Sequence, residues 1–125
     1  GNYTPDEIPE ISKRIDVGLV PSYTETYCLV IREWLSQGVP CITTNYFGSE
    51  IIQDGTNGFV IPTGDADELC RKMRQITGDR ALLGKLTAGA GETYIPTVAD
   101  ECAALESFYE RIGAENERAK PSGSI

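Results

Sequence analysis

The sequence predicts an α/β fold that contains part of a Rossmann-like parallel sheet with flanking helices. Three short apolar segments are typical of buried strands: DVGLV at 16–20, PCITT at 40–44 and GFVI at 58–61. Helical patterns separate and follow these segments, and such alternation indicates a parallel sheet covered on both faces. A complete doubly wound domain has about five or six strands. Three strands therefore correspond to the second half of one.

The expected helices begin and end at local signals. Asp65 with Glu68 three residues later is close to a capping box, and Gly38 followed by Pro40 ends a helix. The helices are expected at residues 6–14, 27–37, 65–76, 79–89 and 97–112. Residues 114–125 are polar and end in KPSGSI, so we expect a flexible tail after a folded region at 1–113.

Composition excludes several classes of function. The chain has 125 residues, which suits one domain, and no apolar run reaches the ~18 residues of a membrane helix. Its polar, acidic start is unlike a secretory signal. A net charge of −8 argues against binding to nucleic acid, whose phosphates attract basic surfaces. One small anion remains possible, because it needs only a few N–H groups and one or two cations.

The four cysteines do not indicate a metal site. They have no C-x-x-C pair, and the chain has no histidine. Cys41 and Cys70 have apolar neighbours and are expected to be small core residues. Reduced thiols are favoured over disulfides, which points to a cytoplasmic protein.

The most informative segment is YTETYCLVIRE at 23–33, which holds two glutamates with seven residues between them. Glu25 is expected in a turn after a strand, and Glu33 within the following helix. The first N–H groups of such a helix have no internal partner and suit a diphosphate. These donors would belong to Tyr27, Cys28, Leu29 and Val30. Carboxylates on either side of this anion site could hold a sugar joined to a nucleotide diphosphate.

Four stretches in order carry a family resemblance: DVGLVPS, ETYCLVIRE, GVPCITT and EIIQDGTNGFVIPTGDADEL. They resemble the C-terminal, donor-binding domain of retaining glycosyltransferases of the GT-B fold, family 4. The resemblance implies that residues 1–113 are a half-domain that binds a UDP-, GDP- or ADP-sugar without a metal or other cofactor. It also implies that the sugar is transferred with retention, through a transition state with oxocarbenium character.

The resemblance implies a role for each site residue. Glu25 would be the catalytic residue that meets the hydroxyls of the donor sugar. Glu33, roughly 9 Å along the helix at 1.5 Å per residue, would accept hydrogen bonds from ribose. The segment Thr26–Val30 would complete the donor site.

The resemblance also implies parts that these residues do not supply. In the family, an Arg and a Lys from earlier strands neutralise the diphosphate. A glycan, lipid or small-molecule acceptor binds a separate N-terminal domain. We therefore expect the isolated chain to bind sugar nucleotides weakly and to show no turnover, and the complete protein could be peripheral to a membrane.

The sequence departs from the family pattern at three places. Cys28 stands where glycine is usual and could crowd the diphosphate, Trp34 replaces a small residue, and the turn before Glu50 lacks its proline and paired glycines. These departures leave a second interpretation open, a non-catalytic, degenerate module that binds a partner or supports a larger assembly. A third, an unrelated flavodoxin-like nucleotide-binding domain, fits the glutamate spacing less well.

Simpler roles remain open for single residues. Glu33 could be a solvated helix residue and Glu25 a turn residue. Tyr23 and Tyr27 could pack under the loop, and Ser22 with Thr24 could cap the turn rather than bind phosphate.

Overall fold

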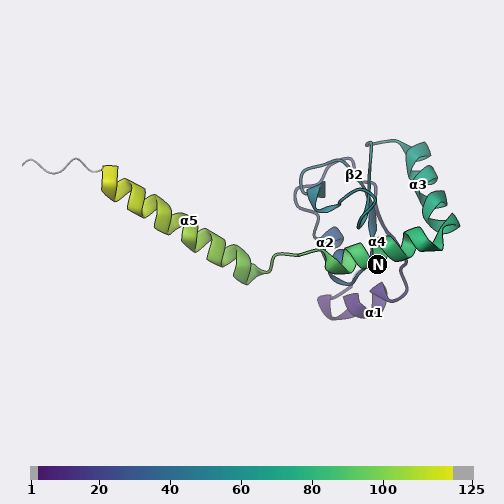
Figure 1. Ribbon diagram of the computed structural model, residues 1–125, viewed down its shortest axis with the longest axis horizontal. Coiled ribbons are helices and arrows are strands. Elements are labelled where there is room, and N and C mark those ends of the chain that lie inside the picture. Colours follow the sequence, from purple (N-terminus) through teal and green to yellow (C-terminus); the bar gives the residue numbers. More distant parts are fainter. Residues whose placement is uncertain (1–2, 120–125) are drawn as a thin grey trace, which may run out of the picture. The chain divides into compact units, whose positions relative to one another are not determined.

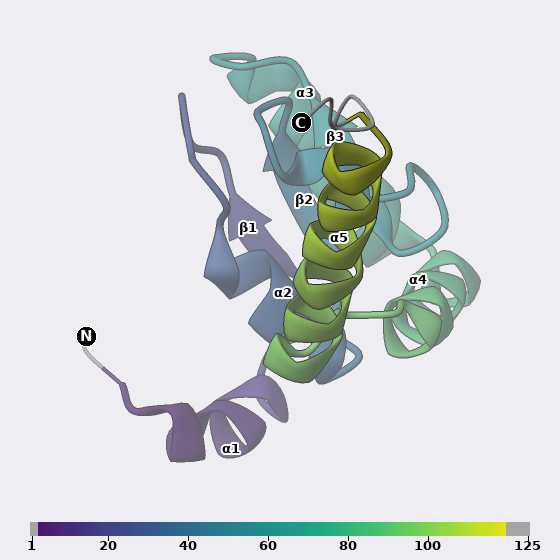
Figure 2. The same cartoon turned by 90° about the vertical axis from the view of Figure 1, so that its left-hand side faces the viewer.

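The computed structural model describes residues 3–119 and confirms the parallel α/β fold. Three strands pair in parallel in the order β1 (Gly18–Val20), β2 (Cys41–Thr44) and β3 (Gly58–Ile61). The register places Gly18 opposite Cys41, and Cys41 opposite Gly58. Figure 2 shows the strands side by side. All three strands were expected from the sequence.

The described helices lie before, between and after the strands in the chain, and Figure 1 labels most of them. The first unit contains the 3₁₀ turn η1 (Pro5–Glu7), α1 (Ile8–Ser12), α2 (Leu29–Ser36), the 3₁₀ turn η2 (Ser49–Ile51), α3 (Ala66–Gly78) and α4 (Arg80–Glu92). Asp65 caps α3 by accepting from the Glu68 N–H at 2.8 Å, as its position in the sequence predicts.

The chain divides into two compact units, Gly1–Ile95 and Pro96–Ile125. The second contains α5 (Val98–Ala119), which begins close to the expected position. It extends past residue 112, so the first part of the expected tail at 114–125 is helical; residues 120–125 lie outside the described range. No described helix is long and apolar enough to cross a membrane.

Neighbouring residues of the central strand β2 face two different cores, as the period of a strand requires. The core that contains Cys41 also contains Ile31, Leu35, Tyr46, Ile52 and Ala90. The core that contains Ile42 also contains Phe59, Ile61, Ile76 and Leu86. Helix α4 contributes to both, through Ala90 and Leu86. Both faces of β2 are therefore covered, and all four of its residues are buried.

The cysteine expectations are half correct. Cys41 is fully buried, and burial raises the pKa of its thiol to about 12. Cys70 is exposed on α3 and is not a core residue. The apolar stripe of α3 includes Leu69 and Ile76, and one residue beyond Leu69 lies about 100° around the helix. An apolar neighbour in sequence therefore did not place Cys70 in the core.

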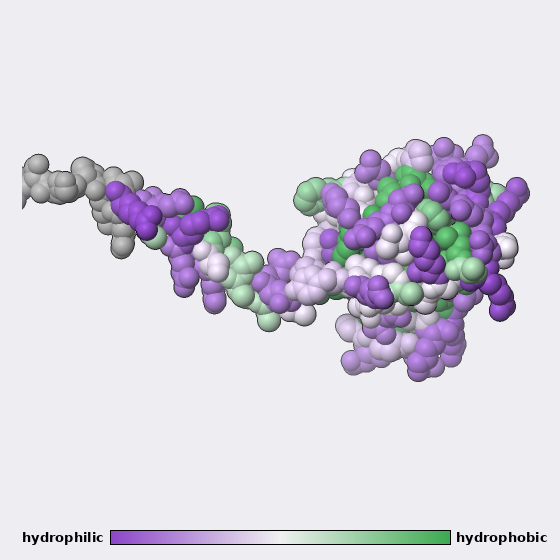
Figure 3. All heavy atoms as spheres, in the orientation of Figure 1, coloured by the Kyte–Doolittle hydropathy of each residue, from purple (hydrophilic) through white to green (hydrophobic). Residues whose placement is uncertain are grey.

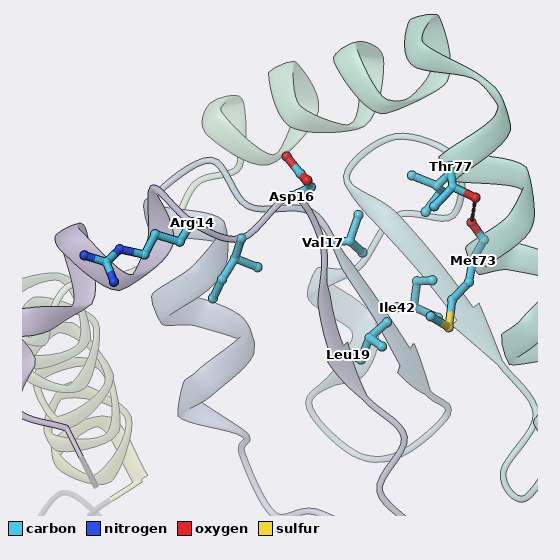
Figure 4. Close-up of a pocket in the computed structure, with 9 residues that line it drawn as sticks. Arg14, Asp16, Val17, Leu19, Ile42, Met73 and Thr77 are labelled. Atoms are coloured by element: carbon cyan, nitrogen blue, oxygen red, sulfur yellow. Dashed lines mark hydrogen bonds between the residues drawn. The ribbon is translucent and has the colours of Figure 1, made fainter. Parts of the chain in front are cut away.

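One edge of the sheet lies open at β1, which pairs only with β2 among the described strands. A groove of about 340 Å³ runs beside it, with Leu19, Ile42, Met73 and Thr77 in its lining (Figure 4). Leu19 is 38% exposed although it belongs to a strand. Apolar surface is also visible among polar atoms in the space-filling view (Figure 3). An apolar edge strand of this kind is the feature expected of part of a larger sheet.

Candidate functional site

The loop between β1 and α2 is attached to the end of β2 by two buried threonines. Thr43 Oγ1 lies 3.1 Å from the Val20 carbonyl oxygen, and the Thr44 hydroxyl donates to the Ser22 carbonyl. Both threonines lie at the carboxyl end of β2, the edge at which open α/β sheets bind ligands. The loop that carries Glu25 is therefore held at this edge.

Glu25 is half-buried in that loop, and the Ser22 hydroxyl donates to its Oε1 at 2.9 Å. The Ser22 hydroxyl is thus directed at the Glu25 carboxylate across the turn. Below the loop, the buried Tyr46 hydroxyl is 2.8 Å from Thr43 Oγ1. Burial, a hydrogen bond with Cys28 and the nearby Glu25 charge all raise the pKa of Tyr46. The Glu25 carboxylate therefore accepts a hydrogen bond from a neutral hydroxyl, that of Ser22, and the neutral Tyr46 hydroxyl lies below the same loop.

Helix α2 begins at Leu29, two residues later than the sequence predicts, and its N-terminus has no side-chain cap. The other described helices of eight residues or more are capped: Asp65 caps α3, Asp79 caps α4 and Thr97 caps α5. The first N–H groups of α2 are thus left without the usual partner. Together with the helix dipole, they favour a bound anion.

Cys28 precedes the helix in a left-handed conformation with φ +51° and ψ 76°. It is the one non-glycine residue of the described chain with positive φ, which explains why a glycine fits this position. A left-handed conformation costs an L-residue about 1–2 kcal/mol. The half-buried side chain packs against the core that contains Ile31 and Tyr46. The late helix start has the same cause, because this backbone cannot continue a right-handed helix.

We expect Cys28→Gly to be about 1 kcal/mol more stable than Cys28→Ala, because only glycine removes the left-handed strain. Denaturation in urea measures the difference. The exposed Cys70 in α3 supplies a matched pair with the opposite sign: Cys70→Gly should be about 1 kcal/mol less stable than Cys70→Ala. Equal stabilities for the two Cys28 variants would contradict the strain.

Glu33 lies one turn into α2 and is half-buried. The Tyr3 hydroxyl donates to its Oε2 at 2.9 Å, and this hydrogen bond raises the pKa of Tyr3. Glu33 also lines a small hollow of about 80 Å³ with Trp34 and residues of α1. Glu33 is therefore not simply solvated, because its carboxylate accepts a hydrogen bond from a hydroxyl group of a distant segment.

Tyr27 and Tyr23 do not pack under the loop. Tyr23 is 80% exposed and Tyr27 41% exposed. The Arg32 guanidinium covers the Tyr27 ring, with Cζ 3.7 Å from the ring centroid. Of the remaining predicted residues, Thr26 and Leu29 are exposed and Val30 is half-buried.

Glu25 therefore lies in the turn and Glu33 in the helix, whereas Tyr27 and Cys28 precede the helix instead of beginning it. Sequence reasoning missed Thr43, Thr44 and Arg32. Two adjacent threonines at the carboxyl end of a predicted strand were a usable signal for the first two. No group of three or more potential metal ligands occurs among residues 3–119.

The fold is an open parallel α/β sheet, a class of domain that binds ligands at the carboxyl edge, where the candidate residues lie. Residues 1–79 match the family Glycosyl transferases group 1, so the chain belongs to that family. It is 35% identical over 78 residues to UDP-Gal:alpha-D-GlcNAc-diphosphoundecaprenol alpha-1,3-galactosyltransferase from Escherichia coli, a match that covers 62% of this chain and 20% of that protein.

Solved structures show the same fold. Sucrose-phosphate synthase from Thermosynechococcus elongatus superposes with a TM-score of 0.78 at 22% identity, over 92% of this chain and 30% of that one. Anabaena Alr3699/HepE, solved in complex with UDP-glucose, has a TM-score of 0.62 at 23% identity, over 68% and 24%. These likenesses confirm a GT-B glycosyltransferase domain fold. The chain spans between 8% and 31% of the length of the curated relatives compared.

Proposed function

We propose that this chain is the donor-binding part of a retaining glycosyltransferase of family 4. The arrangement of Glu25, the uncapped N-terminus of α2 and Glu33 along the carboxyl edge of the sheet carries the proposal. A nucleotide-diphosphate sugar has three groups in the same order: a sugar, a diphosphate and a ribose. Membership of the glycosyl transferases group 1 family supports this match.

Each part of the site has a chemical task. The N–H groups at the start of α2 receive the diphosphate and stabilise the charge that develops on it as the glycosidic bond breaks. Glu25 orients the hydroxyls of the donor sugar next to a transition state with oxocarbenium character. Glu33 accepts hydrogen bonds from the ribose hydroxyls, in the same way as its Oε2 accepts one from the Tyr3 hydroxyl.

The proposed reaction needs groups outside these residues. The cations that neutralise the diphosphate and the domain that binds a glycan, lipid or small-molecule acceptor would belong to a longer protein, and the open edge at β1 is where the rest of this domain would attach. Transfer needs donor and acceptor to be held together. We place the reaction in the cytoplasm, without a metal or other cofactor.

The alternative of a degenerate, non-catalytic module rests on the departures at Cys28 and Gly48. The packing of the Cys28 side chain against the buried core weakens the argument that it crowds the diphosphate. Gly48 still provides a positive φ of 96° in the turn before Glu50, which is the conformation that glycine permits. The two readings differ in whether a sugar nucleotide binds.

Calorimetry with UDP-, GDP- and ADP-sugars on the longer protein tests the proposal. We expect one of the three to bind, and Glu33→Ala to weaken it about 10- to 100-fold, the loss expected for a hydrogen bond to a charged group. Glu92→Ala removes an exposed acid on α4 and should leave the affinity unchanged. Absence of binding would favour the non-catalytic module, and binding indifferent to Glu33 would overturn the ribose assignment.

A further inference from the structure

Arg32 makes two contacts with the residue that precedes the bend at Cys28. Its guanidinium lies over the Tyr27 ring, and its Nη1 donates to the Tyr27 carbonyl oxygen. The charged group is thus held on α2 by the turn that leads into the same helix. A hydrogen bond from a charged donor is roughly twice as strong as a neutral one, so this contact fixes the carbonyl firmly.

Gly48 confines the same residue independently. A Cβ on Gly48 would lie 3.1 Å from the Tyr27 carbonyl oxygen and 3.4 Å from the Tyr27 Cα. Gly48 is itself held, because its N–H donates to Glu50 Oε2 at 2.7 Å. The Tyr27 backbone is therefore fixed by Arg32 and by close packing against Gly48.

Holding the Tyr27 carbonyl also determines where the Cys28 N–H points. A trans peptide is planar, with its C=O and N–H on opposite sides. Because the Tyr27 oxygen accepts from Arg32, the Cys28 N–H is directed away from the guanidinium. No acceptor among residues 3–119 takes this N–H. It immediately precedes the N–H groups at the uncapped start of α2.

One nitrogen of the Arg32 side chain is buried without a partner. Its Nε has no hydrogen-bond partner in the described chain. Burial of an unpartnered polar atom is costly, so the side chain has adopted this position for its other contacts. A cation on the carbonyl also polarises the peptide and makes the N–H on its other side a stronger donor, as in hydrogen-bond chains.

We propose that Arg32 is a positioning residue that orients and polarises the Tyr27–Cys28 peptide, so that the Cys28 N–H meets the nucleoside diphosphate. This role rests on the proposed function of the site. Arg32 acts through the backbone, whereas Glu33, its neighbour in sequence, acts through its own carboxylate. The two adjacent residues therefore serve different parts of the ligand.

The test compares Arg32→Met, which keeps the length and removes the charge, with Arg32→Lys, which keeps the charge and removes the planar group. Arg74→Met removes an exposed arginine from α3 as a control. Each ¹⁵N-labelled chain is examined by NMR and titrated with UDP, GDP and ADP, and with uridine, guanosine and adenosine. Binding of the phosphates is thereby separated from binding of the nucleoside.

In the free protein, Arg32→Met should move the Cys28 and Leu29 amide resonances while those of α3 and α4 stay in place. It should also weaken binding of the nucleoside diphosphate about tenfold, or about 1.4 kcal/mol, and leave the affinity for the nucleoside unchanged. Arg32→Lys should show smaller changes in the same resonances and a smaller loss of diphosphate affinity. If Arg32→Met does not fold, Arg32→Lys alone tests the proposal. Arg74→Met should match the original chain.

Unchanged Cys28 and Leu29 resonances in the free Arg32 variants would overturn the proposal. A loss of diphosphate affinity with those resonances unchanged would instead show that Arg32 contacts the phosphates directly. If neither this chain nor the longer protein binds any of the nucleotides, the proposed function fails. The resonances of the free variants would then still report whether Arg32 orients the peptide.

Discussion

Glu25→Gln is expected to lower sugar transfer by the longer enzyme about 10²- to 10³-fold in kcat/KM, the range for removal of one preorganised electrostatic group. Glutamine has the same size, and its amide oxygen can still accept the Ser22 hydroxyl, which is 2.9 Å from Glu25 Oε1. The fold of the loop should survive while the negative charge is lost. In the proposed function, that charge would orient the donor hydroxyls and lie next to the developing positive charge of the sugar.

The measurement follows transfer of labelled sugar from the donor identified by calorimetry. Glu92→Gln, on the exposed surface of α4, controls for the loss of one negative charge. Ser22→Ala leaves the carboxylate but removes its partner, so it should lower transfer less than Glu25→Gln does. The 125-residue chain alone should show no turnover. Full activity of Glu25→Gln, with Ser22→Ala equally active, would remove Glu25 from the reaction.

The strands could be predicted because their signals are local. Each is a short apolar segment, and β1 and β3 are each followed directly by a proline, Pro21 and Pro62. The start of α2 could not be predicted in the same way. A cysteine with positive φ is rare, and its side chain packs against a core that includes residues distant in sequence, such as Tyr46 and Ala90. Helical periodicity continues through Tyr27 and gives no sign of the bend.

The candidate residues that lie along one segment could be proposed from the sequence, but the side chains that contact them could not. Glu25 and Glu33 follow from spacing within a single strand–turn–helix unit. Tyr3 reaches Glu33 across 30 positions, and Thr44 reaches Ser22 across 22. Such contacts depend on how the elements pack. Arg32 is a different case. It is close to Tyr27 in sequence, but no residue pattern predicts that its side chain folds back over the Tyr27 ring.

Gly18→Ala is expected to destabilise the protein by about 3 kcal/mol, the upper end for overpacking. A Cβ at Gly18 would lie 1.8 Å from Trp34 Cε3 and 2.2 Å from Cζ3, so the indole must move. Gly18 cannot retreat, because it pairs with Cys41 and its N–H donates to the Pro40 carbonyl at 2.9 Å. Trp34, at a position where the family usually has a small residue, therefore depends on a glycine in the adjoining strand.

A double-mutant cycle in guanidinium chloride measures this dependence. Trp34→Ala should destabilise by itself through lost packing, but Gly18→Ala should cost much less in that background, a coupling of about 1–3 kcal/mol. Gly84→Ala is the matched control. This helical glycine has no atom within 4 Å of an added Cβ, so alanine should stabilise the protein by about 0.5–1 kcal/mol. Strictly additive costs at Gly18 and Trp34 would show that the indole does not occupy the space above Gly18.

Since Glu33 precedes Trp34 on α2, displacement of the indole should also weaken the Tyr3–Glu33 hydrogen bond. Loss of that hydrogen bond lowers the raised pKa of Tyr3 towards its ordinary value.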